Sequence, residues 1–281
     1  MSPSPSPITL GEVLRRSADH LAAKGCESPR LDAELLLAHA LGMKRIDLYM
    51  AFDRPLVSAE LDAARVLVAR RAGREPVQHI LGEWGFRRLT LRVDGRALVP
   101  RPETEIVVER CLVLLAGRES PCVLDVGTGT GAIALAIADE HPGARVTGID
   151  VSPDALALAR ENVELTGLVV ELAEHDLFTG LPSGPWDLVV SNPPYIAAAE
   201  ADALAPEVRD WDPHVALFGE DAVAAVARGA VDVVRLGGAL VLEVGDGQAA
   251  AVAELLGGLG FSEMRVTPDL AGRERVVEGI R

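Results

Sequence analysis

Residues 122–131 read CVLDVGTGTG, and Ala132-Ile133-Ala134 follows directly. The opening apolar run is typical of a buried strand, and the glycines indicate a turn that leads into a helix. Glycines at such a turn let the backbone approach a ligand closely, and a helix amino terminus favours polar or anionic groups. The segment therefore predicts a parallel α/β sheet with a nucleotide-like ligand bound at Gly127, Thr128, Gly129, Thr130 and Gly131.

After Pro102 the sequence alternates between strand-like and helix-like segments, which is typical of a doubly wound, mostly parallel sheet. Helices are expected at 131–140 and 153–166. Strands are expected at residues 122–126, 145–149, 188–191, 239–244, 261–266 and 276–280. We assign residues 102–281 to this domain.

The first part of the chain has a different pattern of apolar residues. From Thr9 to about Gly73 the apolar residues recur at helical spacing, and no strand pattern intervenes. Helix starts are indicated by Thr9 with Glu12, by Ser28-Pro29, and by Ser58. Residues 1–77 are therefore predicted to form an all-helical domain.

A short hairpin is predicted between the two domains, within a linker at residues 78–101. Leu89–Val93 alternates in polarity, Asp94-Gly95 is a turn signal, and Ala97–Val99 would be the returning strand.

Composition limits the possible partners and the compartment. The formal net charge is −15 and the pI is about 4.8, which disfavours direct binding to nucleic acid through phosphates. No apolar run of about 20 residues predicts a membrane helix, and residues 1–7 resemble a disordered tail rather than a signal peptide. The three cysteines lack metal-type spacing, so we expect no metal site and a cytoplasmic location.

Asp150 ends the second predicted strand, where a carboxylate can accept hydrogen bonds from a ribose diol. The glycine loop alone leaves alternatives open. Gly127, Gly129 and Ala132 also satisfy the fingerprint of nicotinamide dinucleotide sites. The glycines can also serve tight packing, and Asp150 can cap the following helix.

A second motif, Asn192-Pro193-Pro194-Tyr195, follows the apolar strand at 188–191. In an open α/β sheet it would lie beside the glycine loop. The side-chain oxygen of Asn192 and the carbonyl of Pro193 can accept both N–H bonds of a planar NH₂ group, and Tyr195 offers a flat face for stacking. A plain turn is the alternative, since Asn-Pro often opens turns. The arrangement favours methyl transfer to an amide or amidine nitrogen, with orientation as the main contribution to catalysis.

Together these segments resemble the HemK/PrmC family of peptide chain release factor glutamine methyltransferases. Further similar stretches are VPRPETE at 99–105, LEVG at 242–245 and the segment 269–276. The resemblance implies a Rossmann-like class I methyltransferase domain with a seven-stranded sheet. It implies methylation of the glutamine amide in the Gly-Gly-Gln motif of class I release factors, in translation termination, with S-adenosyl-L-methionine as cofactor.

Family positions carry over residue by residue. The resemblance implies that residues 127–131 border the methionine part of the cofactor, that Asp150 binds its ribose, and that Asn192 touches both cofactor and glutamine. Asp176 would lie at the adenine edge, where the family often has Trp at the position of Leu177. Arg101 and Glu105 would lie near the pocket or form an interdomain salt bridge, and the helical domain would help to hold the release factor.

Three competing functions remain open at the level of sequence. An adenine-specific nucleic acid methyltransferase shares the Asn-Pro-Pro-Tyr motif, but the acidic charge argues against it. A nicotinamide oxidoreductase lacks a candidate acid or base after the glycine loop. A non-enzymatic scaffold that recognises release factors or ribosomes would not need Asn192 and Tyr195.

Overall fold

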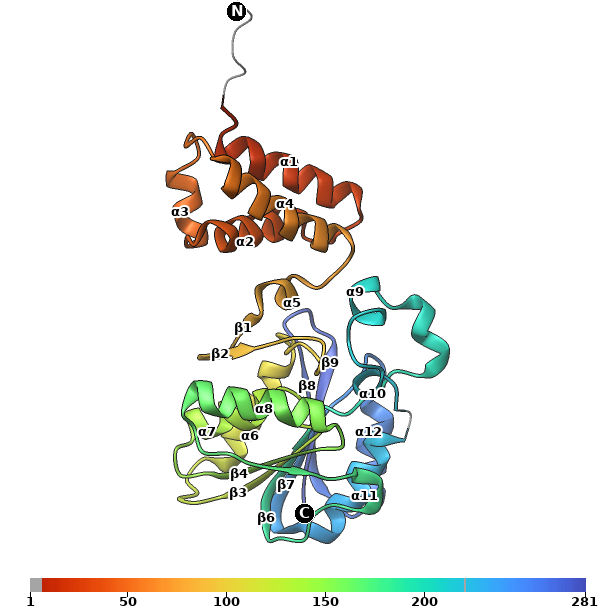
Figure 1. The fold of residues 1–281 in the computed structure, drawn as a ribbon. Helices are drawn as coiled ribbons and strands as arrows, with labels where there is room; N and C mark the ends of the chain where they lie inside the picture. Colours follow the sequence, from red (N-terminus) through yellow and green to blue (C-terminus); the bar gives the residue numbers. More distant parts are fainter. Residues whose placement is uncertain (1–6, 220) are drawn as a thin grey trace, which may run out of the picture. The chain divides into compact units, whose positions relative to one another are not determined.

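The computed structural model describes residues 7–219 and 221–281, and the chain forms two compact units (Figure 1). Unit 1 comprises Met1–Gly82 and Ala205–Trp211, and unit 2 comprises Glu83–Leu204 and Asp212–Arg281. The predicted tail, apart from Pro7, lies outside the described residues. No helix in the described ranges is long and apolar enough to cross a membrane.

Unit 1 is helical, as the periodicity predicts. Its helices are α1 (Leu10–Ala23), α2 (Pro29–Leu41), α3 (Arg45–Met50), α4 (Ser58–Ala72), α5 (Val77–Leu81) and α9 (Pro206–Arg209). The Thr9 hydroxyl caps α1 by accepting the Glu12 N–H, and α2 begins at Pro29. The predicted cap at Ser58 is wrong by one residue. Helix α4 starts at Ser58 itself, because the Glu60 carboxylate accepts the N–H of Val57 at 3.0 Å.

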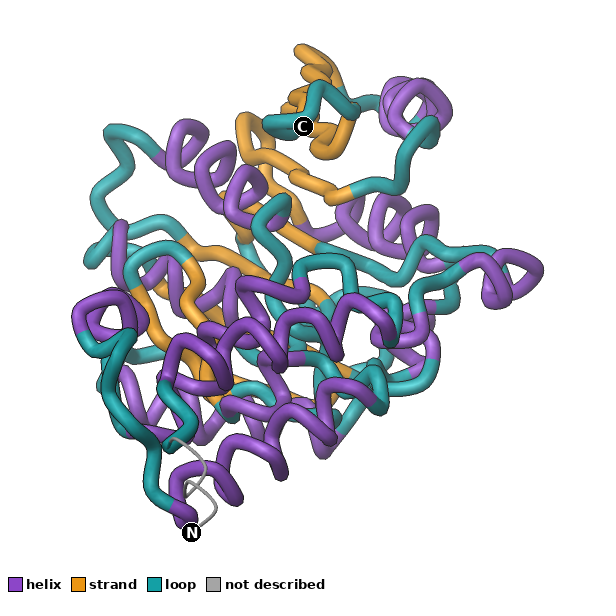
Figure 2. Tube along the Cα trace, turned by 90° about the horizontal axis from the view of Figure 1, so that it is seen from above, coloured by secondary structure: helices purple, strands orange, loops and turns teal. Residues whose placement is uncertain are grey.

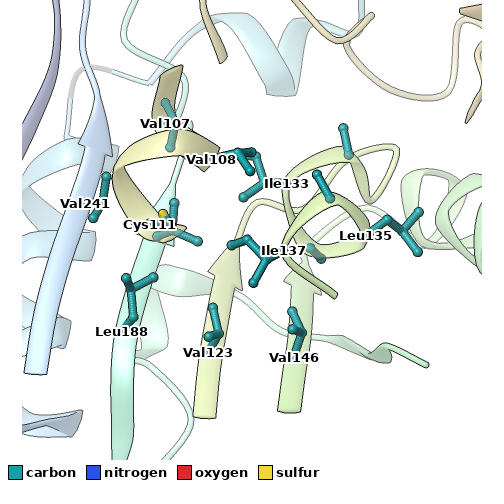
Figure 3. Packing of buried hydrophobic residues seen from close by; sticks show 14 of the residues in the cluster. Val107, Val108, Cys111, Val123, Ile133, Leu135, Ile137, Val146, Leu188 and Val241 are labelled. Atoms are coloured by element: carbon teal, nitrogen blue, oxygen red, sulfur yellow. The ribbon is translucent and has the colours of Figure 1, made fainter. Parts of the chain in front are cut away.

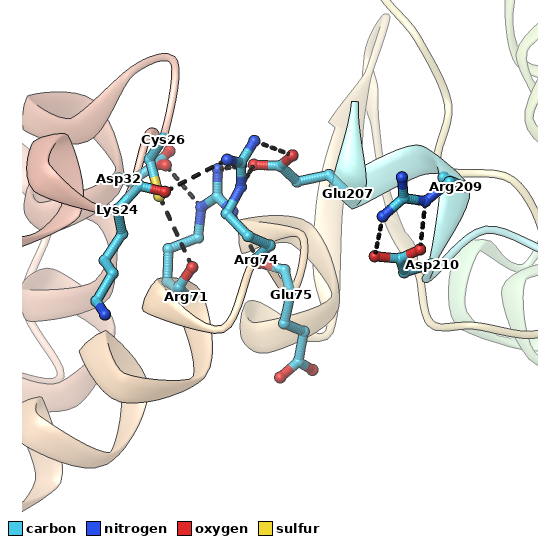
Figure 4. A network of polar contacts seen from close by, with 9 residues as sticks. All are labelled: Lys24, Cys26, Asp32, Arg71, Arg74, Glu75, Glu207, Arg209 and Asp210. Atoms are coloured by element: carbon cyan, nitrogen blue, oxygen red, sulfur yellow. Dashed lines mark hydrogen bonds and ion pairs between the residues drawn. The ribbon is translucent and has the colours of Figure 1, made fainter. Parts of the chain in front are cut away.

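A buried ion-pair cluster joins helices α2, α4 and α9 of unit 1, and α9 comes from much later in the sequence than the other two (Figure 4). The Arg71 guanidinium in α4 donates to Asp32 in α2 and to Glu207 in α9, both at 2.7 Å. Arg74 adds two bonds to Glu207, at 2.8 and 2.5 Å. The chain thus leaves unit 2 after Leu204, contributes α9 to unit 1, and returns at Asp212.

The predicted hairpin exists, and its strand at Leu89–Val93 is confirmed as β2, but β2 pairs with the segment before it and not with Ala97–Val99. Its two strands are β1 (Glu83–Phe86) and β2 (Leu89–Arg92), which pair antiparallel, and both belong to unit 2. Residues 97–99 form no strand. Asp94 instead accepts the Arg96 N–H at 3.0 Å in a local turn, and the apolar side chains that follow are buried without strand pairing. The domain boundaries predicted at residues 77 and 101 differ from the observed division at Gly82. Helix α5 packs on α2 and α4 and so belongs to unit 1.

Unit 2 contains a seven-stranded sheet in the order β5-β4-β3-β6-β7-β9-β8, seen among its helices in Figure 2. Strands β3 to β7 run parallel, and β9 pairs antiparallel with both β7 and β8. The strands are β3 (Cys122–Val126), β4 (Arg145–Asp150), β5 (Glu171–Glu174), β6 (Trp186–Ser191), β7 (Val234–Glu243), β8 (Ser262–Pro268) and β9 (Glu274–Ile280). Sequence patterns did not locate β5, because it is a short edge strand with mostly exposed residues.

Helices cover both faces of this sheet, which confirms the doubly wound prediction. On one face α6 (Thr104–Leu115) and α7 (Ala132–Glu140) pack on Val123, Val146 and Leu188 (Figure 3). On the other face α11 (Ala222–Val233) and α12 (Ala249–Gly258) pack on the alternate residues of the same strands. The remaining elements are α8 (Pro153–Thr166), η1 (Leu177–Thr179), η2 (Ala198–Ala203) and α10 (His214–Leu217).

Candidate active site

A cavity of about 380 Å³ lies in unit 2 at the carboxyl ends of β3, β4 and β6. Its size is typical of a small-molecule site. Strand β3 has β4 on one side and β6 on the other, so the sheet order reverses here, as at the ligand sites of open α/β sheets. Eight of the residues predicted to bind the cofactor line it: Gly127, Thr128, Gly129, Thr130, Asp150, Asp176, Leu177 and Asn192.

The glycine loop closes onto the neighbouring strand through its own backbone. The N–H groups of Gly127 and Thr128 both donate to the carbonyl of Ile149, at 2.8 and 2.9 Å. Gly127 adopts a φ of +73°, and a Cβ at this residue would meet no protein atom within 4 Å. Its bare backbone therefore faces space inside the cavity lining, where a ligand can approach closely.

Gly131, the last residue of the glycine loop, is not part of the cavity lining. It caps α7 with a φ of +81°, and a Cβ there would lie 3.3 Å from Leu135 and 3.5 Å from Ala159. This glycine allows close packing between the loop and two helices.

Asp150 accepts one backbone N–H on each carboxylate oxygen, from Gly129 and from Ser152, both at 2.9 Å. The pKa of Asp150 is raised by burial, against the lowering effect of these bonds. The carboxylate is thus held firmly at the cavity wall. Each oxygen has a further lone pair with which it can accept a ligand hydroxyl.

Asp125 supports the loop from behind. It is fully buried and accepts from the Thr128 hydroxyl at 2.7 Å and from the Ala134 N–H at 3.2 Å. Burial raises the pKa of Asp125 to about 7. In the sequence this residue is visible only as a member of the CVLDVGTGTG stretch, with no role of its own predicted.

At the far wall of the cavity, Asp176 caps the short helix η1 by accepting the Phe178 N–H at 2.9 Å. Leu177 and Phe178 both line the cavity. The aromatic ring that the sequence lacked at position 177 is therefore present at the next residue. Phe178 is 62% exposed, so a planar ligand group can cover it.

The Asn-Pro-Pro-Tyr motif follows β6, whose last residue is tied to β3 by a 2.7 Å bond from the Ser191 hydroxyl to the carbonyl of Val126. Asn192 and Pro194 line the cavity, whereas Pro193 and Tyr195 do not. Burial raises the pKa of Tyr195, and its carbonyl accepts from Gln248 at 3.1 Å.

Arg101 lines the cavity and forms an ion pair with Asp212 at 2.7 Å, inside unit 2. Glu105 accepts the backbone N–H of Arg87 at 3.0 Å and is not part of the lining. The predicted location near the pocket therefore holds for Arg101, while Glu105 secures the hairpin.

Two family models match the sequence. The PrmC N-terminal domain matches residues 12–82, and the methyltransferase small domain matches residues 106–208.

Curated relatives are similar over almost the whole chain. The release factor glutamine methyltransferase of Geobacter sulfurreducens is 43% identical over 286 residues, covering 99% of both chains. That of Deinococcus radiodurans is 45% identical over 281 residues, covering 98% of this chain and 99% of its own. A solved methyltransferase of Pyrococcus furiosus is 18% identical, with a TM-score of 0.51 over 78% of this chain and 98% of that one, and so shares the fold.

Proposed function

This chain belongs to the release factor glutamine methyltransferase family, and we propose that it methylates the side-chain amide nitrogen of glutamine in the Gly-Gly-Gln motif of class I release factors. The observation that carries this proposal is the near full-length similarity, joined to an amide-binding motif at the wall of a small-molecule cavity. The net charge of −15 and these relatives favour a protein substrate over adenine in nucleic acid.

The cofactor is S-adenosyl-L-methionine, which supplies a methyl group already activated by its sulfonium. The residues of the cavity fit this molecule. The bare backbone at Gly127 leaves room for the methionine part, and the carboxylate of Asp150 can accept the ribose hydroxyls. Asp176 and Phe178 are proposed to bind the adenine edge and face.

Asn192 and the carbonyl of Pro193 are proposed to accept the two N–H bonds of the glutamine amide. An amide nitrogen is a weak nucleophile, because its lone pair is delocalised into the carbonyl. Fixing the plane of the NH₂ group therefore supplies much of the catalysis. Pro194 would stiffen this turn, and Tyr195 would bound the substrate site.

Unit 1 is proposed to help hold the release factor. Its support is the match of the PrmC N-terminal domain model, which ends at the boundary between the units. The glutamine itself would be bound by unit 2.

The test is methyl transfer from labelled S-adenosylmethionine to a purified class I release factor. The controls are the same factor with its loop glutamine changed to alanine and an adenine-containing DNA. Label on the intact factor alone is expected. Label on DNA alone would replace this proposal with the adenine function, and no label on either would reject release factors as the substrate.

A further inference from the structure

Two further sequence motifs, VPRPETE at 99–105 and LEVG at 242–245, contribute side chains beside Asn192. Thr104 of the VPRPETE segment is the first residue of α6, and Glu243 of the LEVG segment is the last residue of β7. The Asn192 Nδ2 atom donates to Thr104 Oγ1 at 3.3 Å, and Thr104 Oγ1 donates to Glu243 Oε2 at 2.7 Å. Thr104 and Asn192 both line the cavity, whereas Glu243 lies behind Thr104 and is not part of the lining. Thr104 is 4% exposed and Glu243 is 2% exposed.

The direction of this hydrogen-bond chain follows from the chemistry of its last member. An ionised carboxylate only accepts hydrogen bonds, so the Thr104 hydroxyl proton must point toward Glu243. The lone pairs of the hydroxyl oxygen then face Asn192 and require an N–H donor. The Asn192 amide is therefore held with its nitrogen toward Thr104.

This orientation matters because the two ends of an asparagine amide have nearly the same shape but opposite hydrogen-bonding character. A glutamine NH₂ group donates hydrogen bonds. It can be bound by the Asn192 oxygen, whereas an Asn192 amide turned by 180° would present donors to donors.

We propose that Thr104 and Glu243 are positioning residues that hold the Asn192 amide with its oxygen available to the substrate NH₂ group. This inference rests on the proposed function. It explains why a carboxylate is buried at the end of β7 with a hydroxyl as its hydrogen-bond partner at 2.7 Å. Neither residue needs to touch the substrate.

The charge on Glu243 sets the direction of the chain, so the protonation of this residue should affect turnover. Burial raises the pKa of Glu243 to about 7, opposed by the Thr104 hydroxyl, by the charge of Arg275 in β9 and by a hydrogen bond from the Asn192 side chain. The other ionisable groups facing it are Glu103, ahead of α6, and Tyr195, after β6. A protonated Glu243 can itself donate a hydrogen bond to Thr104. The Thr104 hydroxyl is then free to rotate, and the hydrogen-bond chain no longer fixes the orientation of the Asn192 amide.

The first experiment compares the wild-type chain with the isosteric Thr104→Val variant, using labelled cofactor and a purified class I release factor. Loss of the hydroxyl should lower kcat about tenfold or more, the equivalent of one hydrogen bond made in the transition state. The Kd for S-adenosylmethionine, measured by calorimetry, should change less than about twofold. Thr104→Ser, which keeps the hydroxyl, should restore most of kcat.

A matched control is Thr166→Val at the end of α8, away from the cavity lining. It removes a partly buried hydroxyl that donates to the backbone carbonyls of Asn162 and Val163. Its kcat should be close to wild type. Thermal unfolding of all variants separates loss of folded protein from loss of turnover.

The pH dependence of kcat distinguishes a positioning role of Glu243 from a purely structural one, which would leave the profile unchanged. Wild-type kcat should rise with pH through about 7, and Glu243→Gln should lose this rise, because its side chain has no charge to gain. A wild-type kcat in Thr104→Val, or no rescue by Thr104→Ser, would overturn the inference. Failure of the wild-type chain to methylate the release factor would instead reject the proposed function.

Discussion

The buried ion-pair cluster of unit 1 differs from the two buried acids behind the cavity of unit 2 in how the cost of burial is offset. In unit 1 the Arg71 guanidinium, 6% exposed, is matched by the carboxylates of Asp32 and Glu207 at 2.7 Å. In unit 2 Asp125 and Glu243 are buried against hydroxyl, amide and backbone donors. Burial raises the pKa of both of these acids to about 7.

The difference separates structural from functional burial. Paired ions offset the cost of desolvation and join segments that lie far apart in sequence, as Asp32, Arg71 and Glu207 do. Acids without such pairing cost stability, and they occur mainly where a site needs a fixed acceptor. Asp125 and Glu243 accept hydrogen bonds from Thr128 and Thr104, which both line the cavity. Glu278, a buried acid elsewhere in unit 2, is instead paired with Arg110 at 2.7 Å.

The largest effect is expected for Arg71→Met, which leaves the buried Asp32 without its cation and leaves Arg74 as the remaining partner of the half-buried Glu207. We expect a loss of about 3–5 kcal/mol in the free energy of unfolding, measured with urea. The control is Arg70→Met on the same helix, which breaks a more exposed pair with Glu75 and should cost about 1 kcal/mol or less. Equal losses in both variants would contradict a special role for the buried pair.

The second prediction concerns the pH dependence of stability. Because folding raises the pKa of Asp125 from 3.8 to about 7, the folded state binds the proton more tightly than the unfolded chain. Stability should therefore fall as the pH rises from about 4 to about 7. At about 1.4 kcal/mol per pKa unit the fall is about 4 kcal/mol.

Asp125→Asn should remove this part of the dependence, since an amide does not titrate. Urea unfolding at several pH values between 4 and 8, without cofactor, measures it. An unchanged slope in the variant would assign the dependence to other groups.

The third prediction has the opposite pattern from Arg71→Met, with a large loss of turnover and little loss of stability. Asn192→Ala should lower turnover about 100-fold or more, because the NH₂ group of the substrate loses its acceptor, while the free energy of unfolding changes by less than about 1 kcal/mol. Labelled methyl transfer and urea unfolding measure the two quantities. Near-normal turnover would remove Asn192 from the proposed mechanism.

The smallest effect is expected for Asp150→Ala. Calorimetry should show cofactor binding about tenfold weaker, the equivalent of one hydrogen bond to a charged group. Asp154→Ala provides the control, because Asp154 is exposed at the start of α8 and does not line the cavity. If both variants bind equally well, the ribose contact lies elsewhere.

The sequence predicted the parts of the site that depend on local order along the chain. The glycine loop, Asp150 and Asn192 each follow a strand with a clear apolar pattern, and parallel strands bring their carboxyl ends to one edge. The partner strand of the hairpin was misassigned to residues 97–99, because the turn signal at Asp94-Gly95 belongs to a local turn and does not join two strands.

Other features could not be found in this way. Phe178 enters the lining by its place in a short helix, and α9 joins unit 1 through Glu207, which lies 133 residues from Arg74 and 136 from Arg71. No periodicity links such positions.

The sequence by itself determined a helical unit, a doubly wound sheet and the motifs at the strand ends, because backbone propensity and apolar spacing act over a few residues. Only the tertiary structure decided how the polar groups are partnered. Thr104, Asn192 and Glu243 lie up to 139 residues apart and meet because α6 begins where β6 and β7 end, at the same edge of the sheet. The direction of a hydrogen bond depends on which atoms face one another, and that is settled only when the sheet has formed.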